Sequence, residues 1–388
     1  MPLLVSYTLK NVLARKLTSV LTIFGIALVV FVFSAVMMLT HGLGQTLVST
    51  GYDNNAIIIR RASQTEIQSI IPRAMGNAAK ADPAIKRDSD GTLLFANEIV
   101  VLIAKNKKSS GEPTNIPVRG ITEVSLRVRP DTKIVEGRMW HEGTSEIIVG
   151  RKVEQNFEGC ALGNQIKFGG RSWTIVGVME SAGSAFESEV WGDYNQLAPA
   201  FERPIFSSLT VTLNSLQDFD AMKERLESDP RMTVEVKREK QYYEDQSRFT
   251  TLFINILGTI ISVVFSLGAI VGAMITMYSS VANRTIEIGT LRALGFRRRN
   301  ILGAFLVESV MISIIGGALG IAGASVLQFV EVSTTNWDTF AELAFSFEAS
   351  SGIVLKGMIF AIVMGIVGGF FPAVRASRFR IVNALRAK

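Results

Sequence analysis

The chain has 388 residues, a net charge of +6, two histidines and one cysteine. Hydrophobic residues make up 48% of it and charged residues only 19%, whereas soluble domains carry about a quarter charged residues. The apolar excess lies in four blocks, so the composition indicates a membrane protein with a globular insert and excludes an ordinary soluble enzyme. The single cysteine, Cys160, excludes an intrachain disulfide, and so few histidine and cysteine side chains argue against a transition-metal site.

The first apolar block, 17–39, contains no charged residue and predicts a membrane-spanning helix. Such a helix is about 34 Å long, which is enough to cross the hydrocarbon core of a bilayer. A cleaved signal peptide is the alternative, but the apolar stretch is too long for one and no small-residue cleavage site follows it closely. We therefore expect an uncleaved span, preceded by a cytoplasmic amphipathic segment over 1–16.

A long segment of soluble character, 40–248, follows the first span. Alternating runs such as 55–61 predict strands, while 65–79 predicts a helix that Pro72 kinks or shortens. From about 132 to 199 the sequence changes to short strands joined by glycine-rich turns. We predict an α+β domain with two subdomains, one of βαβ type and porter-like, the other small and β-rich.

This segment contains no pattern typical of a catalytic site. Glu187 and Glu189 lie near Asp193 and could form paired carboxylates, but we favour a solvated loop for them. The run 181–188 lacks the G-x-S-x-G pattern of a nucleophile elbow. We therefore expect a chain that is not an enzyme and that holds no cofactor or metal of its own.

Three further apolar blocks predict three more spans. The second block, 249–283, has 35 residues without a charge, so we expect its helix to continue beyond the membrane as a stalk, since about 20 residues suffice to cross a bilayer. The remaining predicted segments are a cytoplasmic loop at 284–300, a third span at 301–327, a short external loop at 328–352, a fourth span at 353–374 and a cytoplasmic tail at 375–388.

Basic residues beside the spans predict the orientation, because short loops rich in Lys and Arg stay in the cytoplasm. The segment before the first span, the 284–300 loop and the tail are all basic, whereas the 328–352 loop has four acidic residues and no basic one. We predict a multi-pass protein of the bacterial inner membrane with both termini in the cytoplasm and 40–248 on the periplasmic or extracellular side. The net positive charge is then a topology signal, and nothing points to nucleic acid.

The loop between the second and third spans reads NRTIEIGTLRALGFRRRN over 283–300. As a helix it places Ile288, Leu291 and Leu294 near one face, and Gly295 ends it. A short amphipathic helix of this kind can lie on the membrane surface or insert into a groove of a partner protein. The residues alone leave both possibilities open.

Glycines four residues apart occur in three of the predicted spans and indicate close helix packing or dimerisation. The pairs are Gly268 and Gly272, Gly316 and Gly320, and Gly365 and Gly369. Glu308 is the one acidic residue inside a predicted span. It either marks a functional position or accepts a hydrogen bond that packs the helices together.

Together these features resemble the FtsX-like and MacB-type permeases of ABC (type VII) systems over essentially the whole chain. The membrane motifs are RTIEIGTLRALG at 284–295, FLVES at 305–309, GGALG at 316–320 and PAVRASRFRIVNALR at 372–386. The patterns VRGI, EIIVG and GNQIKFGGRSWTIVGVM are similar to those of the MacB-type periplasmic core domain. Unlike MacB itself, the sequence has no fused ATPase domain, which implies a split permease with a separate ATPase.

The resemblance implies that the 284–295 loop is a coupling helix seated in a groove of an ABC ATPase. It assigns this contact to Arg284, Glu287, Ile288, Gly289, Leu291, Arg292, Ala293 and Gly295, and it assigns helix packing or dimerisation to the six paired glycines and Glu308. The sequence contains no G-x-x-x-x-G-K-[ST] motif. ATP and Mg²⁺ are therefore expected on the partner ATPase.

The family's mechanism implies a homodimer that transmits ATP-driven motion to a periplasmic domain, without passing substrate through a membrane channel (mechanotransmission). The expected partners are the ATPase, a second permease copy, a periplasmic adaptor or membrane-fusion protein, and membrane lipid. Export or efflux is the leading function. The alternatives are FtsX-like signalling that activates an external cell-wall hydrolase and LolC/LolE-like release of lipoproteins.

Overall fold

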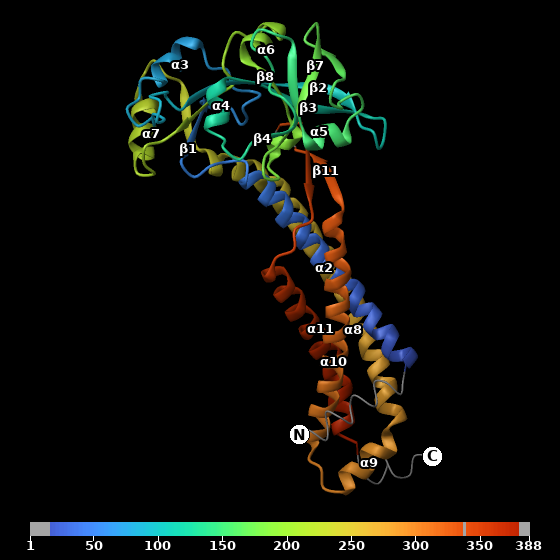
Figure 1. Ribbon diagram of the computed structural model, residues 1–388. Helices are drawn as coiled ribbons and strands as arrows, with labels where there is room; N and C mark the ends of the chain where they lie inside the picture. Colours follow the sequence, from blue (N-terminus) through green and yellow to red (C-terminus); the bar gives the residue numbers. More distant parts are fainter. Residues whose placement is uncertain (1–15, 337–338, 380–388) are drawn as a thin grey trace. The chain divides into compact units, whose positions relative to one another are not determined.

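The computed structural model describes residues 16–336 and 339–379 (Figure 1). Contacts divide these residues into two compact units. The membrane unit holds the described parts of 1–42, 252–330 and 346–388, and the globular unit holds those of 43–251 and 331–345. The predicted amphipathic segment 1–16, apart from Lys16, and the predicted tail beyond Phe379 lie outside the described residues.

Four helices in the described part of the chain are long and apolar enough to cross a membrane, which confirms the predicted number of spans. They are α2 (Lys16–Val48), α8 (Glu239–Asn283), α10 (Arg298–Ser325) and α11 (Ser351–Ser377). α8 is one unbroken helix of 45 residues (Figure 1). Its length of about 68 Å is more than twice the thickness of a hydrocarbon core. Only Thr250–Asn283 has the composition of a span, so the first turns of α8 extend the helix beyond it.

Small residues allow the helices of the membrane unit to approach closely. A Cβ atom at Gly320 of α10 would lie 2.5 Å from the carbonyl oxygen of Ala27 in α2, which is closer than real side chains pack. In α11, Gly365 and Gly369 lie against Ser309 of α10, whose hydroxyl donates a 2.6 Å hydrogen bond to the Gly365 carbonyl oxygen. Backbone contacts of this kind replace the hydrophobic effect, which is weak between helices in lipid.

The globular unit is built on a mixed sheet of ten strands with the order β10-β1-β9-β2-β3-β8-β5-β7-β4, in which β6 pairs with β7. The β3–β8 and β5–β7 pairs are parallel, and the other neighbouring strands are antiparallel. The strands are β1 (Asn55–Arg60), β2 (Phe95–Asn106), β3 (Pro113–Ile121), β4 (Lys133–Gly137), β5 (Glu146–Gly150), β6 (Gln165–Phe168), β7 (Arg171–Glu180), β8 (Val190–Asp193), β9 (Ser208–Thr212) and β10 (Val234–Arg238).

The long strand β2 belongs to both halves of this sheet. Its residues Phe95–Glu98 pair with β9, and Ile99–Asn106 pair with β3. The two predicted subdomains therefore correspond to the two sides of β2, and one continuous hydrophobic core runs beneath both. The predicted combination of membrane helices and an α+β domain is confirmed.

Short helices cover this sheet. They are α3 (Arg73–Ala79), α4 (Glu123–Arg127), α5 (Arg151–Asn156), the 3-10 turn η1 (Ala185–Ser188), α6 (Tyr194–Ala200) and α7 (Asp218–Ser228). The helix predicted over 65–79 is shorter than expected, because α3 begins directly after Pro72. Proline has no N–H to donate and is tolerated at a helix start but not inside.

The predicted short external loop 328–352 contains secondary structure that the sequence reasoning missed. A 3-10 turn, η2 (Val326–Phe329), is followed by strands β11 (Glu331–Thr335) and β12 (Glu342–Ser346), which pair as a two-stranded sheet. We call β11, β12 and the described residues between them, 336 and 339–341, the hairpin. Its residues 331–345 belong to the globular unit although the chain before and after them forms α10 and α11 of the membrane unit.

Candidate functional site

The predicted coupling residues lie on α9 (Thr285–Ala293), the helix between α8 and α10, and on its flanks. Ile288 is buried and packs against Phe305 and other side chains of the membrane unit, and Leu291 contacts the same cluster. Leu294 does not join this face as predicted: it lies at the end of the helix and is 73% exposed. Ile286 on the opposite side is 55% exposed. α9 thus has one face fixed to the bundle and presents apolar side chains on the other.

Gly295 and Arg292 shape the end of α9. Gly295 has a φ of +95°, a left-handed conformation that favours glycine and commonly ends a helix, as predicted. Arg292 donates a 3.2 Å hydrogen bond to the carbonyl oxygen of Phe296. Ala293 is exposed, whereas Gly289 is buried beside Ile288. The structure therefore divides the predicted coupling residues into a packed group and an accessible group.

Arg284 joins α9 to α10 by two ion pairs. Its guanidinium lies 3.0 Å from the Glu287 carboxylate on α9 and 2.9 Å from the Glu308 carboxylate on α10. The same guanidinium carbon lies 5.1 Å from the ring centre of Phe305. The side chains of Arg284 and Glu308 are only 12% and 8% exposed, so this ion pair between the start of α9 and α10 is nearly buried.

Four of the six predicted packing glycines contact another helix within the chain. Gly316 lies against Ile26 of α2, in the same interface as the Gly320 contact described above, and Gly365 and Gly369 lie against α10. An added Cβ at Gly268 or Gly272 would meet no atom of the described residues within 4 Å. These two glycines line an apolar groove of about 410 Å³ between α2 and α8.

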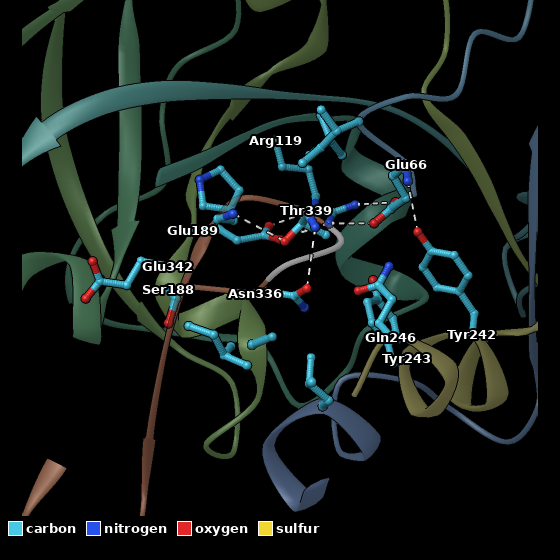
Figure 2. A pocket seen from close by; sticks show the side chains of 17 residues that line it. Glu66, Arg119, Ser188, Glu189, Tyr242, Tyr243, Gln246, Asn336, Thr339 and Glu342 are labelled. Atoms are coloured by element: carbon cyan, nitrogen blue, oxygen red, sulfur yellow. Dashed lines mark hydrogen bonds and ion pairs between the residues drawn. The ribbon is translucent and has the colours of Figure 1, made fainter. Parts of the chain in front are cut away.

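A second candidate site is a small cavity of about 60 Å³ in the globular unit, which we call the Arg119 pocket (Figure 2). Three parts of the chain that lead to membrane helices line it. Leu47 comes from the end of α2, and Tyr242 and Tyr243 come from the first turns of α8. The hairpin contributes Asn336, Thr339, Ala341, Glu342 and Leu343. The remaining lining residues belong to the body of the globular unit.

Arg119 of β3 is the centre of a buried ion cluster beside this pocket. Its guanidinium lies 2.8 Å from Glu66, 2.9 Å from Glu98 and 2.7 Å from Glu189 (Figure 2 shows the first and the last). Arg129 forms a second set of contacts, with Glu98 and with Glu239. All six side chains are nearly inaccessible to solvent, and such charges are tolerated in a protein interior only when they are paired.

The cluster contains four carboxylates and two guanidinium groups, so it is not neutral when every group is ionised. Burial opposes ionisation of Glu98, but attraction by Arg129 and Arg119 outweighs it and lowers the pKa of this carboxyl. Glu239 lies at the edge of the cluster, where burial raises the pKa of its carboxyl despite the opposing attraction of Arg129. Of these two carboxyls, Glu239 protonates first as the pH falls.

The first turns of α8 are held in this cluster. The amide of Tyr52 and the side chain of Asn55 donate hydrogen bonds of 3.1 and 2.9 Å to Glu239, the first residue of the helix. Tyr242 accepts a 2.9 Å hydrogen bond from the amide of Glu66, and Tyr243 packs edge-on to Phe186. The outer end of α8 is thus fixed to the body of the globular unit.

The ion cluster corrects one prediction. Glu187 and Glu189 were expected in a solvated loop, but both are buried. Glu187 accepts hydrogen bonds from the amides of Ser181 and Gly183, and Glu189 accepts hydrogen bonds from Arg119 and from the Trp191 ring nitrogen. Fixed pairing of this kind is typical of structural carboxylates. Within the described residues, no three His, Cys, Asp or Glu side chains are grouped as metal ligands.

Comparison with known proteins identifies both parts of the chain. Residues 19–229 match the MacB-like periplasmic core domain, and residues 259–381 match the FtsX-like permease C-terminal family. The uncharacterized ABC transporter permease YknZ of Bacillus subtilis is 26% identical over 97% of both chains. The macrolide export ATP-binding/permease protein MacB of Bdellovibrio bacteriovorus is 25% identical over 96% of this chain and 60% of its own length.

Two solved domains are also similar. The extracellular domain of YknZ from Gram-positive bacteria has 17% identity and a TM-score of 0.36, covering 47% of this chain and all of its own. The periplasmic region of MacB from Actinobacillus actinomycetemcomitans has 14% identity and a TM-score of 0.36, covering 48% of this chain and 90% of its own.

Four apolar helices long enough to cross a membrane, an inserted α/β unit and a short helix between the second and third of these helices define a multi-pass membrane protein. The family matches are more specific, since together they extend from residue 19 to residue 381 with a short gap. The chain belongs to the MacB/FtsX-type family of ABC transporter permeases.

Proposed function

We propose that the chain is the permease subunit of an ATP-driven export system and that a separate ABC ATPase binds to α9. The observation that carries this proposal is the two-sided character of α9. Ile288 fixes one face to the membrane unit, while Ile286 and Leu294 are exposed. Exposed apolar residues spaced along a helix are typical anchors for a partner's groove.

Arg284 supplies the route by which movement of α9 reaches the spans. Because it pairs with Glu287 on α9 and Glu308 on α10, a displacement of α9 acts directly on the third span. α8 supplies a second route, since it runs without a break from the α9 side to Glu239 in the buried ion cluster. We infer that ATP-driven motion is delivered to the globular unit in this way (mechanotransmission).

The remaining parts of the proposal concern location and assembly. We place the chain in a bacterial inner membrane, with both termini in the cytoplasm and the globular unit on the periplasmic or extracellular side. Basic residues surround α9, whereas the 328–352 loop has acidic residues and no basic one. A second copy would fill the groove at Gly268 and Gly272, and an adaptor would bind the globular unit. Export is favoured because the MacB relatives carry that function in their names.

Co-purification tests the proposed contact with an ATPase. The full chain, with Ile286→Glu or Leu294→Glu, is co-expressed with the candidate ATPase and purified through a tag on the permease. Each charge should weaken ATPase binding by about tenfold or more, as loss of a central apolar anchor does. Leu162→Glu is the matched control, because Leu162 is a 40% exposed leucine of the globular unit. Full retention of the ATPase by both α9 variants would refute the assignment.

A further inference from the structure

The hairpin is held to the globular unit through its own backbone. The amide of Ala344 on β12 lies 3.3 Å from the Ser188 hydroxyl, to which it donates a hydrogen bond. The carbonyl oxygen of the same residue accepts a 3.0 Å hydrogen bond from the ammonium group of Lys152. One residue of β12 thus has both of its backbone polar groups bound by side chains of α5 and η1.

A second set of contacts comes from the β2–β3 ribbon. Lys107, just after β2, reaches both strands of the hairpin: its ammonium group lies 2.8 Å from the Glu342 carboxylate on β12 and 3.1 Å from the Ser333 hydroxyl on β11. Asn115 of β3 donates a 3.0 Å hydrogen bond to the carbonyl oxygen of Phe340. The turn and both strands of the hairpin are therefore bound.

The docked hairpin also closes the Arg119 pocket. Leu343, Ala344 and Phe345 are at most 5% exposed, so β12 forms part of the apolar interior. The pocket beneath is imperfectly filled, because the hydroxyl of Tyr243 has no hydrogen-bond partner among the described residues and the cavity has room for a few waters. The docked hairpin therefore supplies no hydrogen bond to this hydroxyl.

The chain passes between the two units four times, and the hairpin accounts for two of these passages. The other two are made by α2 and α8, which are continuous helices across the boundary. Displacing either helix from the globular unit would break a helix or its buried ion cluster. The hairpin, in contrast, is held by the buried apolar side chains of β12, by hydrogen bonds and by a Lys107–Glu342 pair whose lysine side chain is 23% exposed, and its release breaks no helix.

We propose that the hairpin is a releasable strap: it ties the outer ends of α10 and α11 to the globular unit and lets go during the ATPase cycle. Release would uncover the Arg119 pocket while α8 remains fixed in it. The segment between α10 and α11 would then be free of the globular unit, while the packing of α10 on α2 is kept. This inference rests on the proposed function, since the ATPase supplies the motion that opens the strap.

A disulfide between Ser188→Cys and Ala344→Cys tests the strap in the full-length chain. The contact between the Ser188 hydroxyl and the Ala344 amide brings the two residues within reach of a disulfide. Cys160→Ser removes the native thiol. Oxidation of this variant without nucleotide should produce the crosslink, and the Ser188→Cys single variant is the control. No crosslink at rest would overturn the inference.

The ion pair provides an independent check on docking at rest. Lys107→Glu or Glu342→Lys should each lower the rate of crosslinking by about tenfold, because each places like charges together and removes a charged hydrogen bond. Lys107→Glu combined with Glu342→Lys should restore most of the rate. A double variant as slow as the single ones would show that the pair does not hold the hairpin and would count against the strap.

Nucleotide dependence tests release. The permease with its co-purified ATPase is oxidised without nucleotide and again after trapping with ATP and vanadate. We expect the crosslinking rate to fall several-fold in the trapped state; an equal rate in both states would overturn release. ATPase co-purification is scored separately, so a chain that binds no ATPase refutes the proposed function. Even in that case, the crosslinking rate of the Lys107→Glu, Glu342→Lys double variant still decides whether the hairpin docks on the globular unit.

Discussion

The ion pair between Arg284 and Glu308 permits a quantitative prediction. Arg284→Gln leaves two carboxylates, Glu287 and the nearly buried Glu308, without their shared cation. Removing one partner of a buried ion pair costs about 3–5 kcal/mol, because the remaining charge loses a compensating charge without returning to water. Glu308→Gln is expected to cost less, about 1–3 kcal/mol, since Arg284 keeps Glu287 as a partner.

The double variant isolates the interaction itself. With Gln at both positions the nearly buried charge of Glu308 is gone, and only the 39% exposed Glu287 has lost its cation. The combined loss should therefore fall below the sum of the single losses by at least about 1 kcal/mol. Arg292→Gln on the same helix is the control, because its guanidinium donates a hydrogen bond to the nearby carbonyl oxygen of Phe296. Its effect should stay within about 0.5 kcal/mol.

The free energy of unfolding is measured by SDS titration of the purified chain in mixed micelles, followed by circular dichroism. Co-purification of the ATPase is measured in parallel on the same variants. Additive losses, with no coupling between Arg284 and Glu308, would refute the view that this pair connects α9 to α10.

Three further predictions concern the two units separately. Glu239→Gln should become more stable relative to the parent chain as the pH rises above about 4.3, the ordinary pKa of a glutamate. The pKa of Glu239 is raised in the folded state, so its stabilising contribution in the parent chain is present at lower pH and is lost as the carboxyl ionises. Thermal unfolding of both forms from pH 4 to pH 8 measures the difference, and parallel curves would contradict it. Gly320→Leu should prevent the close packing of α10 on Ala27 of α2 and so lower the melting temperature, whereas Gly272→Ala should leave the melting temperature of the single chain unchanged. Equal melting temperatures of the two variants would exclude the α2–α10 contact. Trp173→Ala should cost about 3–5 kcal/mol of unfolding free energy, because this side chain is fully buried in the core beneath the sheet; a chemical denaturation midpoint like that of the parent would show that it is not a core residue.

The membrane half was the more predictable part, for a physical reason. Long uncharged segments have few stable environments other than a bilayer, so composition alone located four spans. The glycines at 316 and 320 lie against α2, where close approach requires a missing side chain. The apolar face of α9 was predicted less well: Leu294 falls beyond the last helical residue, where helical periodicity no longer applies.

The buried ion cluster could not be predicted from local sequence. A glutamate normally indicates exposure, which is why Glu187 and Glu189 were placed in a solvated loop. The partner that buries Glu189 is Arg119, 70 positions away in the sequence, and only the sheet brings the two together. The hairpin did leave a signal in the two short β-branched or apolar runs EVSTT and ELAFS, which flank a turn at Asn336.

The hairpin has a consequence for how the globular unit is defined as a fragment. A protein cut from 43 to 251 would contain every strand of the main sheet but would lack 331–345. Water would then enter beside Arg119 and Tyr243, and Lys107 and Lys152 would lose their partners on β12. The natural folding unit is discontinuous in the gene, so a faithful excised domain needs the segment between the last two spans fused back to it.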